Sequence, residues 1–160
     1  MKLILCQYLA NLRERKDLDA ILPDLLSQMG LNVISRPSIG TRQFGVDVAA
    51  VGSIDKGPET VYLFSVKAGN LDRTTWNGTT EQALRPSLDE IIDSYVPYVL
   101  SPEHKDKPIT ICVCIGAEVH EAARQQVSGY YETMEKKHEA WRLSFQEWNG
   151  DRLAALIQEH

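Results

Sequence analysis

The sequence predicts an α/β domain in which helices flank a mixed β-sheet. Three observations lead to this prediction: helical patterns occupy both ends of the chain, two strand-like runs surround a turn-rich segment, and helical patterns separate the later strands. Crossovers through helices leave the later strands parallel to a neighbour. We therefore expect an α-β-β-β-α-β core followed by a further α-β-α.

The chain is expected to begin with helices and a first strand. Residues 3–15 and 17–29 have amphipathic patterns, and they form two helices or one helix kinked at Pro23. Gly30 suits the end of this helical region, because glycine commonly follows the last helical residue. Residues 31–35 are then the first strand.

Two apolar runs, residues 44–51 and 60–68, predict an antiparallel hairpin. The segment between them holds glycines and a proline, which are typical of turns. A hairpin that closes symmetrically about Lys56 places Asp47 opposite Ser65.

The rest of the chain is expected to alternate helices with strands. Residues 69–78 predict a polar loop, and residues 101–108 predict a charged one. The remaining elements, in chain order, are a helix at 80–99, a strand at 109–115, a helix at 118–137, a strand at 141–145 and a helix at 149–158.

Composition limits the classes of protein that are open. At 160 residues, with 43% hydrophobic and 24% charged residues, the chain has the size and composition of one soluble domain. No run approaches the roughly 20 apolar residues of a membrane span, and no signal peptide is evident. The three cysteines, Cys6, Cys112 and Cys114, lack framework spacing, so we expect reduced thiols, a cytoplasmic protein and no membrane partner.

Charged residues interrupt the two apolar runs of the hairpin. Asp47 lies in the first run and Lys67 near the end of the second, where a buried charge costs several kcal/mol unless it is matched. In the symmetric register Asp47, Ser65 and Lys67 share one face, with roughly 7–8 Å between the backbones of the diagonal pair. This grouping predicts a functional site, and a cross-strand ion pair is the structural alternative.

These residues resemble a known family. The Gly-Val-Asp at residues 45–47, the Ser-Val-Lys at residues 65–67 and the acid-bearing helix around Asp19 resemble the PD-(D/E)XK nuclease superfamily, particularly its Mrr-like restriction-endonuclease branch. The resemblance covers roughly residues 17–115 and implies a restriction-endonuclease-like fold. It implies a Mg²⁺-dependent endodeoxyribonuclease, with Mn²⁺ as an alternative ion and DNA as the substrate.

The resemblance also implies roles for individual residues. Asp47 would hold the metal together with the Val66 carbonyl and Ser65. Lys67 would orient the attacking water. Asp19 would contact the metal through a water, with Glu14 and Asp17 as alternatives for that role. Two positions depart from the family pattern: Ser65 replaces an acidic ligand with a weak neutral one, and Asp19 stands where glutamate is commoner.

Contacts with DNA are expected from individual arginines. A net charge of −5 argues against binding through bulk electrostatics. Arg42, in the loop that enters the Asp47 strand, and Arg73, after the Lys67 strand, are the candidate phosphate contacts, with a solvated surface role as the alternative for each.

The last residues extend the resemblance. Residues 143–158, LSFQEWNGDRLAALIQ, are similar to the end of Mrr-like effector domains in multidomain prokaryotic defence proteins. We therefore expect residues 1–160 to be one nuclease-like domain of a longer antiviral protein, acting as a homo-oligomer or with a fused sensor or nucleotide-binding region. Two alternatives remain: a catalytically silent nuclease fold that binds nucleic acid or mediates assembly, and an unrelated α/β domain with an incidental ion pair.

Overall fold

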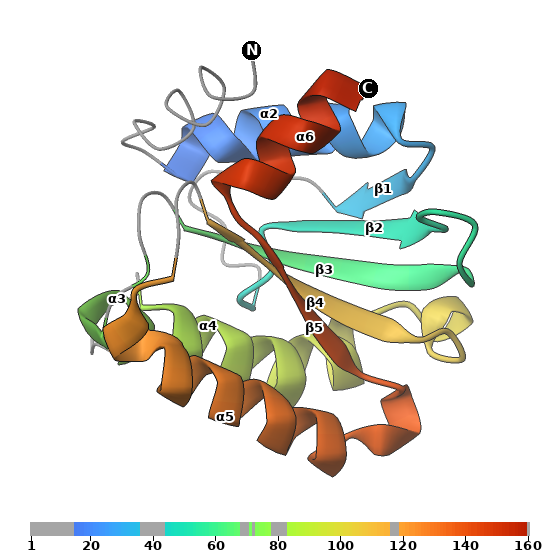
Figure 1. Ribbon diagram of the computed structural model, residues 1–160. Coiled ribbons are helices and arrows are strands. Elements are labelled where there is room, and N and C mark those ends of the chain that lie inside the picture. The colour runs from blue at the N-terminus through green and yellow to red at the C-terminus, as the bar shows by residue number, and fades with distance from the viewer. Residues whose placement is uncertain are drawn as a thin grey trace.

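The protein is an α/β domain with a mixed five-stranded sheet flanked by helices, as the sequence predicts (Figure 1). A computed structural model describes residues 15–35, 44–67, 71, 73–77, 83–115 and 119–159. The strands are β1 (Asn32–Ser35), β2 (Val48–Gly52), β3 (Thr60–Lys67), β4 (Ile109–Ile115) and β5 (Ser144–Trp148). Most of the predicted first helix, residues 3–15, lies outside the described residues.

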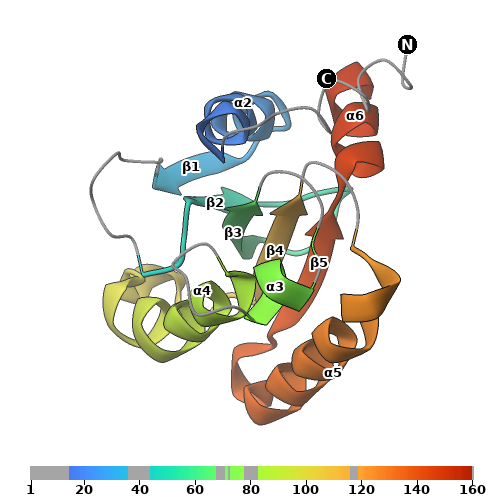
Figure 2. The ribbon, with the colours of Figure 1, turned by 90° about the vertical axis from the view of Figure 1, so that its left-hand side faces the viewer.

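The helices form two layers, one on each side of the sheet. They are α2 (Arg15–Gln28), α3 (Arg73–Asn77), α4 (Leu84–Glu90), the π-helix η1 (Ile91–Val99), the 3₁₀ turns η2 (Pro102–His104) and η3 (Glu139–Trp141), α5 (Glu121–Lys137) and α6 (Gly150–Glu159). Figure 2 shows α2 and α6 over one face and α3, α4 and α5 over the other. None of the described helices is long and apolar enough to cross a membrane.

The strands follow their chain order across the sheet. β1, β2 and β3 are antiparallel neighbours, and β4 and β5 add to β3 in parallel. The two parallel strands follow crossovers that contain α4 and α5. Both crossovers lie on the same face, as the fixed handedness of such connections requires for strands added in one direction.

The hairpin closes in the predicted register. The pairs from Val48 with Phe64 to Gly52 with Thr60 are all symmetric about Lys56. Asp55 and Lys56 both have positive φ, and the Gly57 N–H donates to the Ile54 carbonyl at 3.0 Å. This tight turn lies within the connection between Gly52 and Thr60, the paired ends of the two strands.

Each face of the sheet has its own apolar core. Under α2 and α6 lie alternate residues of the central strands, among them Phe64, whose ring meets Trp148 edge to face at 4.9 Å. Under α4 and α5 lie the other residues of the same strands, including Val61, Leu63 and Val113. Because both faces are covered, β3 and β4 are buried along their whole lengths.

Two predictions for the first crossover are corrected. The predicted polar loop at 69–78 contains the short helix α3, whose Trp76 is 1% exposed and meets the Tyr130 ring edge to face at 5.3 Å. The predicted helix at 80–99 is described from residue 84, as α4 followed by η1. Pro97 lies inside η1 and cannot donate a backbone hydrogen bond there.

The predicted strand at 141–145 begins later, at Ser144. Trp141 belongs to η3 instead, with its ring stacked on His138 at 4.1 Å. Arg142 then takes a left-handed conformation, with φ of 52°, which turns the chain into β5. The aromatic residue that suggested a strand therefore packs on the end of α5.

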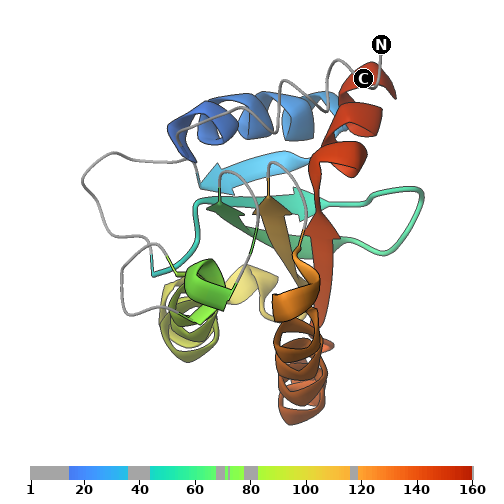
Figure 3. The same cartoon turned by 60° about the vertical axis from the view of Figure 1, so that its left-hand side comes forward.

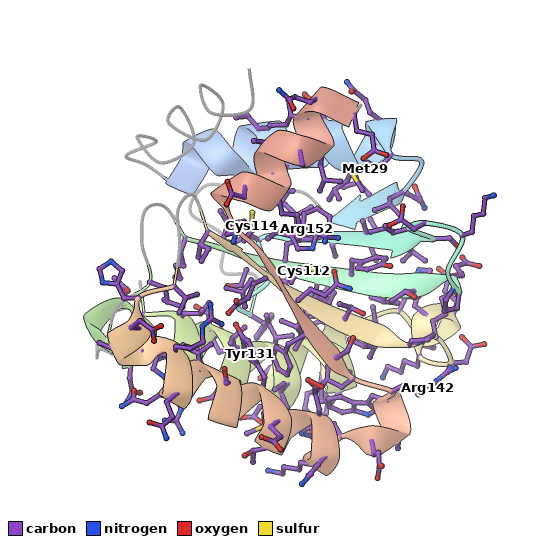
Figure 4. All side chains as sticks on the ribbon, viewed as in Figure 1. Met29, Cys112, Cys114, Tyr131, Arg142 and Arg152 are labelled. Carbon is purple, nitrogen blue, oxygen red and sulfur yellow. The ribbon has the colours of Figure 1, made fainter. Side chains whose placement is uncertain are left out.

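The face under α2 and α6 also takes up the buried cysteines. Cys112 and Cys114 both lie on this side of β4, and each is fully buried. Figure 4 shows them below α6, the helix that carries Arg152. Burial, strengthened by the neighbouring Cys114, raises the pKa of the Cys112 thiol. These cysteines therefore occupy core positions.

Candidate active site

The candidate site lies where β3 ends. Side chains alternate along a strand, so Ser65 and Lys67 project to the same face as Val61 and Leu63, toward α4. Ser65 is 1% exposed and Lys67 is 8% exposed. β4 ends beside β3, with Ile115 paired to Lys67. Figure 3 shows the ends of these strands. Two polar side chains thus continue an apolar row without leaving the protein interior.

Asp47 reaches this end of β3 from the neighbouring strand. It directly precedes β2, its N–H donates to the Phe64 carbonyl at 2.8 Å, and its Oδ2 accepts a hydrogen bond from the Val66 N–H at 2.7 Å. Its side chain takes the place of a strand neighbour for that buried N–H. The carboxylate, itself 8% exposed, is therefore fixed beside the residue that separates Ser65 from Lys67.

The carboxylate bond alone has a structural explanation, because it satisfies a buried donor at a strand end. That explanation does not account for the buried Ser65 and Lys67. A buried ammonium costs several kcal/mol unless its surroundings compensate for the charge, and a plain strand end would carry an apolar residue instead. The grouping that the hairpin register predicts is therefore of three buried polar residues, two on β3 and one directly before β2.

The hydroxyl of Ser65 is buried without a hydrogen bond to any described residue. Leaving a buried hydroxyl unpaired costs about 1–3 kcal/mol. A buried hydroxyl without a partner would be stabilised by a further polar group that bonds to it.

The atoms at this site that could bind a metal ion are oxygens. Within the described ranges, no three or more His, Cys, Asp and Glu side chains come together in a group that could hold a metal ion. Among the described residues, the end of β3 has the Asp47 carboxylate, bonded to the Val66 N–H, and the hydroxyl of Ser65, the residue before Val66. Hard cations such as Mg²⁺ prefer oxygen ligands of these kinds and retain several waters.

The structure does not place the other predicted side chains relative to this group. Asp19 belongs to α2, which packs on the opposite face of the sheet through residues such as Leu22 and Leu26. Arg73 is the first residue of α3. The side chains of both residues, and Arg42 as a whole, lie outside the described part of the structure. Their roles stay predictions.

Sequence reasoning placed Gly45 in the motif but gave it no function. In the structure the turn at Gly45 lies directly on the backbone of α4. A glycine two residues before a buried aspartate is a signal that could have indicated such a role, since glycine permits both positive φ and close approach.

Comparisons with known proteins give one structural likeness. No family model and no curated protein matches the sequence. A solved structure described as MspJI restriction endonuclease in complex with a 27-mer oligonucleotide is similar, with a TM-score of 0.39 and 13% sequence identity. The likeness covers 98% of this chain and 30% of that one, so this chain spans less than a third of its length. The case for a site rests on this chain's own residues.

Proposed function

We propose that the chain is a metal-dependent endonuclease that hydrolyses phosphodiester bonds of DNA in the cytoplasm, as an effector of anti-phage defence. One observation carries the proposal. The buried Asp47 carboxylate is held on the Val66 N–H at 2.7 Å, between two further buried polar residues, Ser65 and Lys67. This arrangement offers an anion for a cation and a cation for a phosphate at one strand end.

The residues present fit a divalent cation. The carboxylate is fixed on the Val66 N–H, and the neighbouring residue Ser65 has a buried hydroxyl oxygen without a partner among the described residues. We propose Asp47, Ser65 and the Val66 carbonyl as the protein ligands. When bound, Mg²⁺ or Mn²⁺ would supply Lewis acidity, polarising the scissile phosphate and easing deprotonation of the attacking water.

The chain's own residues would do the remaining work. The Lys67 ammonium, a compact charge on a flexible stem, would orient the attacking water and offset negative charge that develops on the phosphate. Asp19 would hold a further water, and Arg42 and Arg73 would contact DNA phosphates. Cleavage of both strands by a domain with one site requires two copies, so we propose that the active form is a homo-oligomer or an assembly through a fused region.

Plasmid cleavage tests the proposal. The purified protein is incubated with supercoiled DNA in Mg²⁺, in Mn²⁺ and in EDTA, beside the variants Asp47→Ala and Lys67→Ala. We expect metal-dependent nicking or linearisation that falls by about 10³-fold in either variant, because each removes a charge that acts in the transition state.

The hairpin supplies matched controls for these variants. Asp55 and Lys56 carry the same two charges at the exposed turn, at the far end of the same two strands. Asp55→Ala and Lys56→Ala should cleave like the wild type. Full activity in Asp47→Ala or Lys67→Ala, with folding confirmed by thermal unfolding, would overturn the assignment of the site.

A second candidate function follows from Ser65. A hydroxyl stands where the family pattern has an acid, which favours a catalytically silent fold that binds nucleic acid or mediates assembly. This alternative predicts DNA binding without measurable Mg²⁺ affinity in calorimetry, and it predicts that Ser65→Glu increases metal binding. Metal-dependent cleavage by the wild type would exclude it.

A further inference from the structure

The backbone just before Asp47 adopts an unusual conformation. Phe44 and Gly45 have φ of +53° and +83°, a region that glycine enters readily and other residues rarely do. Two successive residues of this kind turn the chain sharply before it enters β2. Phe44 itself is 40% exposed, whereas Val46 is 1% exposed and lies in the core.

Gly45 also makes a contact that no other residue type permits. A Cβ atom at this position would lie 2.0 Å from the carbonyl oxygen of Ser87 and 3.0 Å from Cγ1 of Ile91. The first distance is far inside van der Waals contact. Because the Ser87 atom belongs to the backbone, no side-chain rotation could relieve the clash.

The surface that Gly45 touches is firmly held. Ser87 lies in α4, between Leu84 and Leu88, and both leucines are fully buried in the core under the sheet. Ile91, which follows α4 directly, is fully buried as well. The carbonyl that meets Gly45 therefore belongs to a helix that cannot move without disturbing the core.

Asp47 is held between this helix and β3. Gly45 rests on Ser87 on one side, and two residues later Asp47 bonds to Phe64 and Val66 on the other. Val46 fills the core between these two anchors. The span from the helix contact to the carboxylate is thus too short for its ends to move independently.

We propose that Gly45 is a positioning residue, whose missing side chain lets the turn lie on the Ser87 carbonyl so that α4 sets where the Asp47 carboxylate stands at the end of β3. The structural part of this proposal depends only on geometry. Its catalytic consequence rests on the proposed nuclease function.

The Val66 amide reports the position of the carboxylate directly. In ¹H–¹⁵N spectra at one fixed pH, Asp47→Ala removes the acceptor and gives the resonance of an amide without that bond. We expect Gly45→Ala to shift the Val66 resonance at least halfway toward the Asp47→Ala position. A Val66 resonance that stays at its wild-type position in a folded Gly45→Ala protein would overturn the proposal.

Gly30 supplies the matched control. It has a similar φ of +90°, but a Cβ added there meets nothing within 4 Å. Gly30→Ala therefore carries the same backbone strain without the helix clash, and its Val66 resonance should remain at the wild-type position. An equal shift in both variants would show that general loosening, and not the contact with α4, moves Asp47.

A second variant covers the case in which Gly45→Ala does not fold. Leu88→Ala leaves the turn intact and removes a buried side chain that anchors α4. We expect it to move the Val66 resonance in the same direction by a smaller amount. An unmoved Val66 resonance in folded Leu88→Ala would contradict the role of α4.

Kinetics then separate this proposal from the nuclease proposal. If the wild type cleaves DNA, Gly45→Ala should lower kcat by about 100-fold with KM nearly unchanged, because a small misplacement of a catalytic group affects the transition state most. A loss confined to KM would overturn the positioning role. If the wild type does not cleave, the nuclease proposal fails, whereas the Val66 signal still decides whether Gly45 positions Asp47.

Discussion

The two ends of β3 carry different chemistry on the same buried face. Near its start Val61 and Leu63 pack into the core under α4, and near its end Ser65 and Lys67 occupy the equivalent positions. All four side chains are less than 10% exposed. The difference therefore lies in residue type and not in burial.

This difference shows which end of the strand serves stability. Apolar side chains at the start gain from leaving water, whereas a hydroxyl and an ammonium at the end lose hydration that the fold must replace. A strand selected for stability alone would continue with Val or Leu. The polar end is expected to be costly for folding and necessary for activity, and three variants test this division.

Leu63→Ala should have the largest effect on stability. The side chain is fully buried, and removing it should lower the free energy of unfolding by about 2–5 kcal/mol through lost transfer energy and a residual cavity. Cleavage per folded molecule should stay near the wild-type value. Denaturant unfolding and cleavage at low temperature measure both quantities, and loss of activity in fully folded protein would break the comparison.

Asp47→Ala should have an intermediate effect. It leaves the buried Val66 N–H without its acceptor, so the free energy of unfolding should fall by about 1–3 kcal/mol. Asp47→Asn is the matched variant, because its amide oxygen can still accept that bond while the charge is gone. We expect the asparagine variant to recover most of the stability and none of the cleavage in urea melts and plasmid assays. Equal stability of the two variants would contradict a structural value for the bond.

Ser65→Ala should have the smallest effect on stability. Its hydroxyl is buried without a partner, so its removal should leave the free energy of unfolding within about 1 kcal/mol of the wild type or raise it. Thr60 is the control on the same strand, because its buried hydroxyl donates to the Pro58 carbonyl at 2.9 Å. Thr60→Ser removes the methyl group but keeps the hydroxyl. Comparing it with Thr60→Ala therefore gives the effect of losing the hydroxyl alone. If the free energy of unfolding falls more in Ser65→Ala than in Thr60→Ala, the Ser65 hydroxyl stabilises the fold, and the proposed contrast between the two ends of β3 is wrong.

Elements that depend on local signals could be predicted from the sequence. The hairpin register follows from the turn around Lys56 and from alternation along both strands, so the neighbourhood of Asp47 and Ser65 was accessible before the structure. The strand Ile109–Ile115 was predicted with its observed bounds, because a continuous apolar run between a charged loop and a helical pattern has few other interpretations.

Features that depend on packing between distant segments could not be predicted. Trp76 stands among polar residues, and the helix α3 that carries it is explained by its burial in the core, where its ring meets Tyr130 of α5. The start of β5 depends on Trp141 stacking on His138. The contact of Gly45 with Ser87 and the unpaired Ser65 hydroxyl depend on how the core is assembled. No local sequence pattern predicts either feature.

The local closure of the hairpin has a consequence for the order of folding. Asp47 directly precedes β2, and Ser65 and Lys67 lie on β3, so the closure of one hairpin can bring them together early, whereas pairing of β3 with β4 must await closure of a long crossover. The α4 surface under Gly45 is part of that crossover and docks with it. We therefore expect the three polar residues to come together before the helix α4 docks under Gly45. Activity would then appear only with the last step of folding.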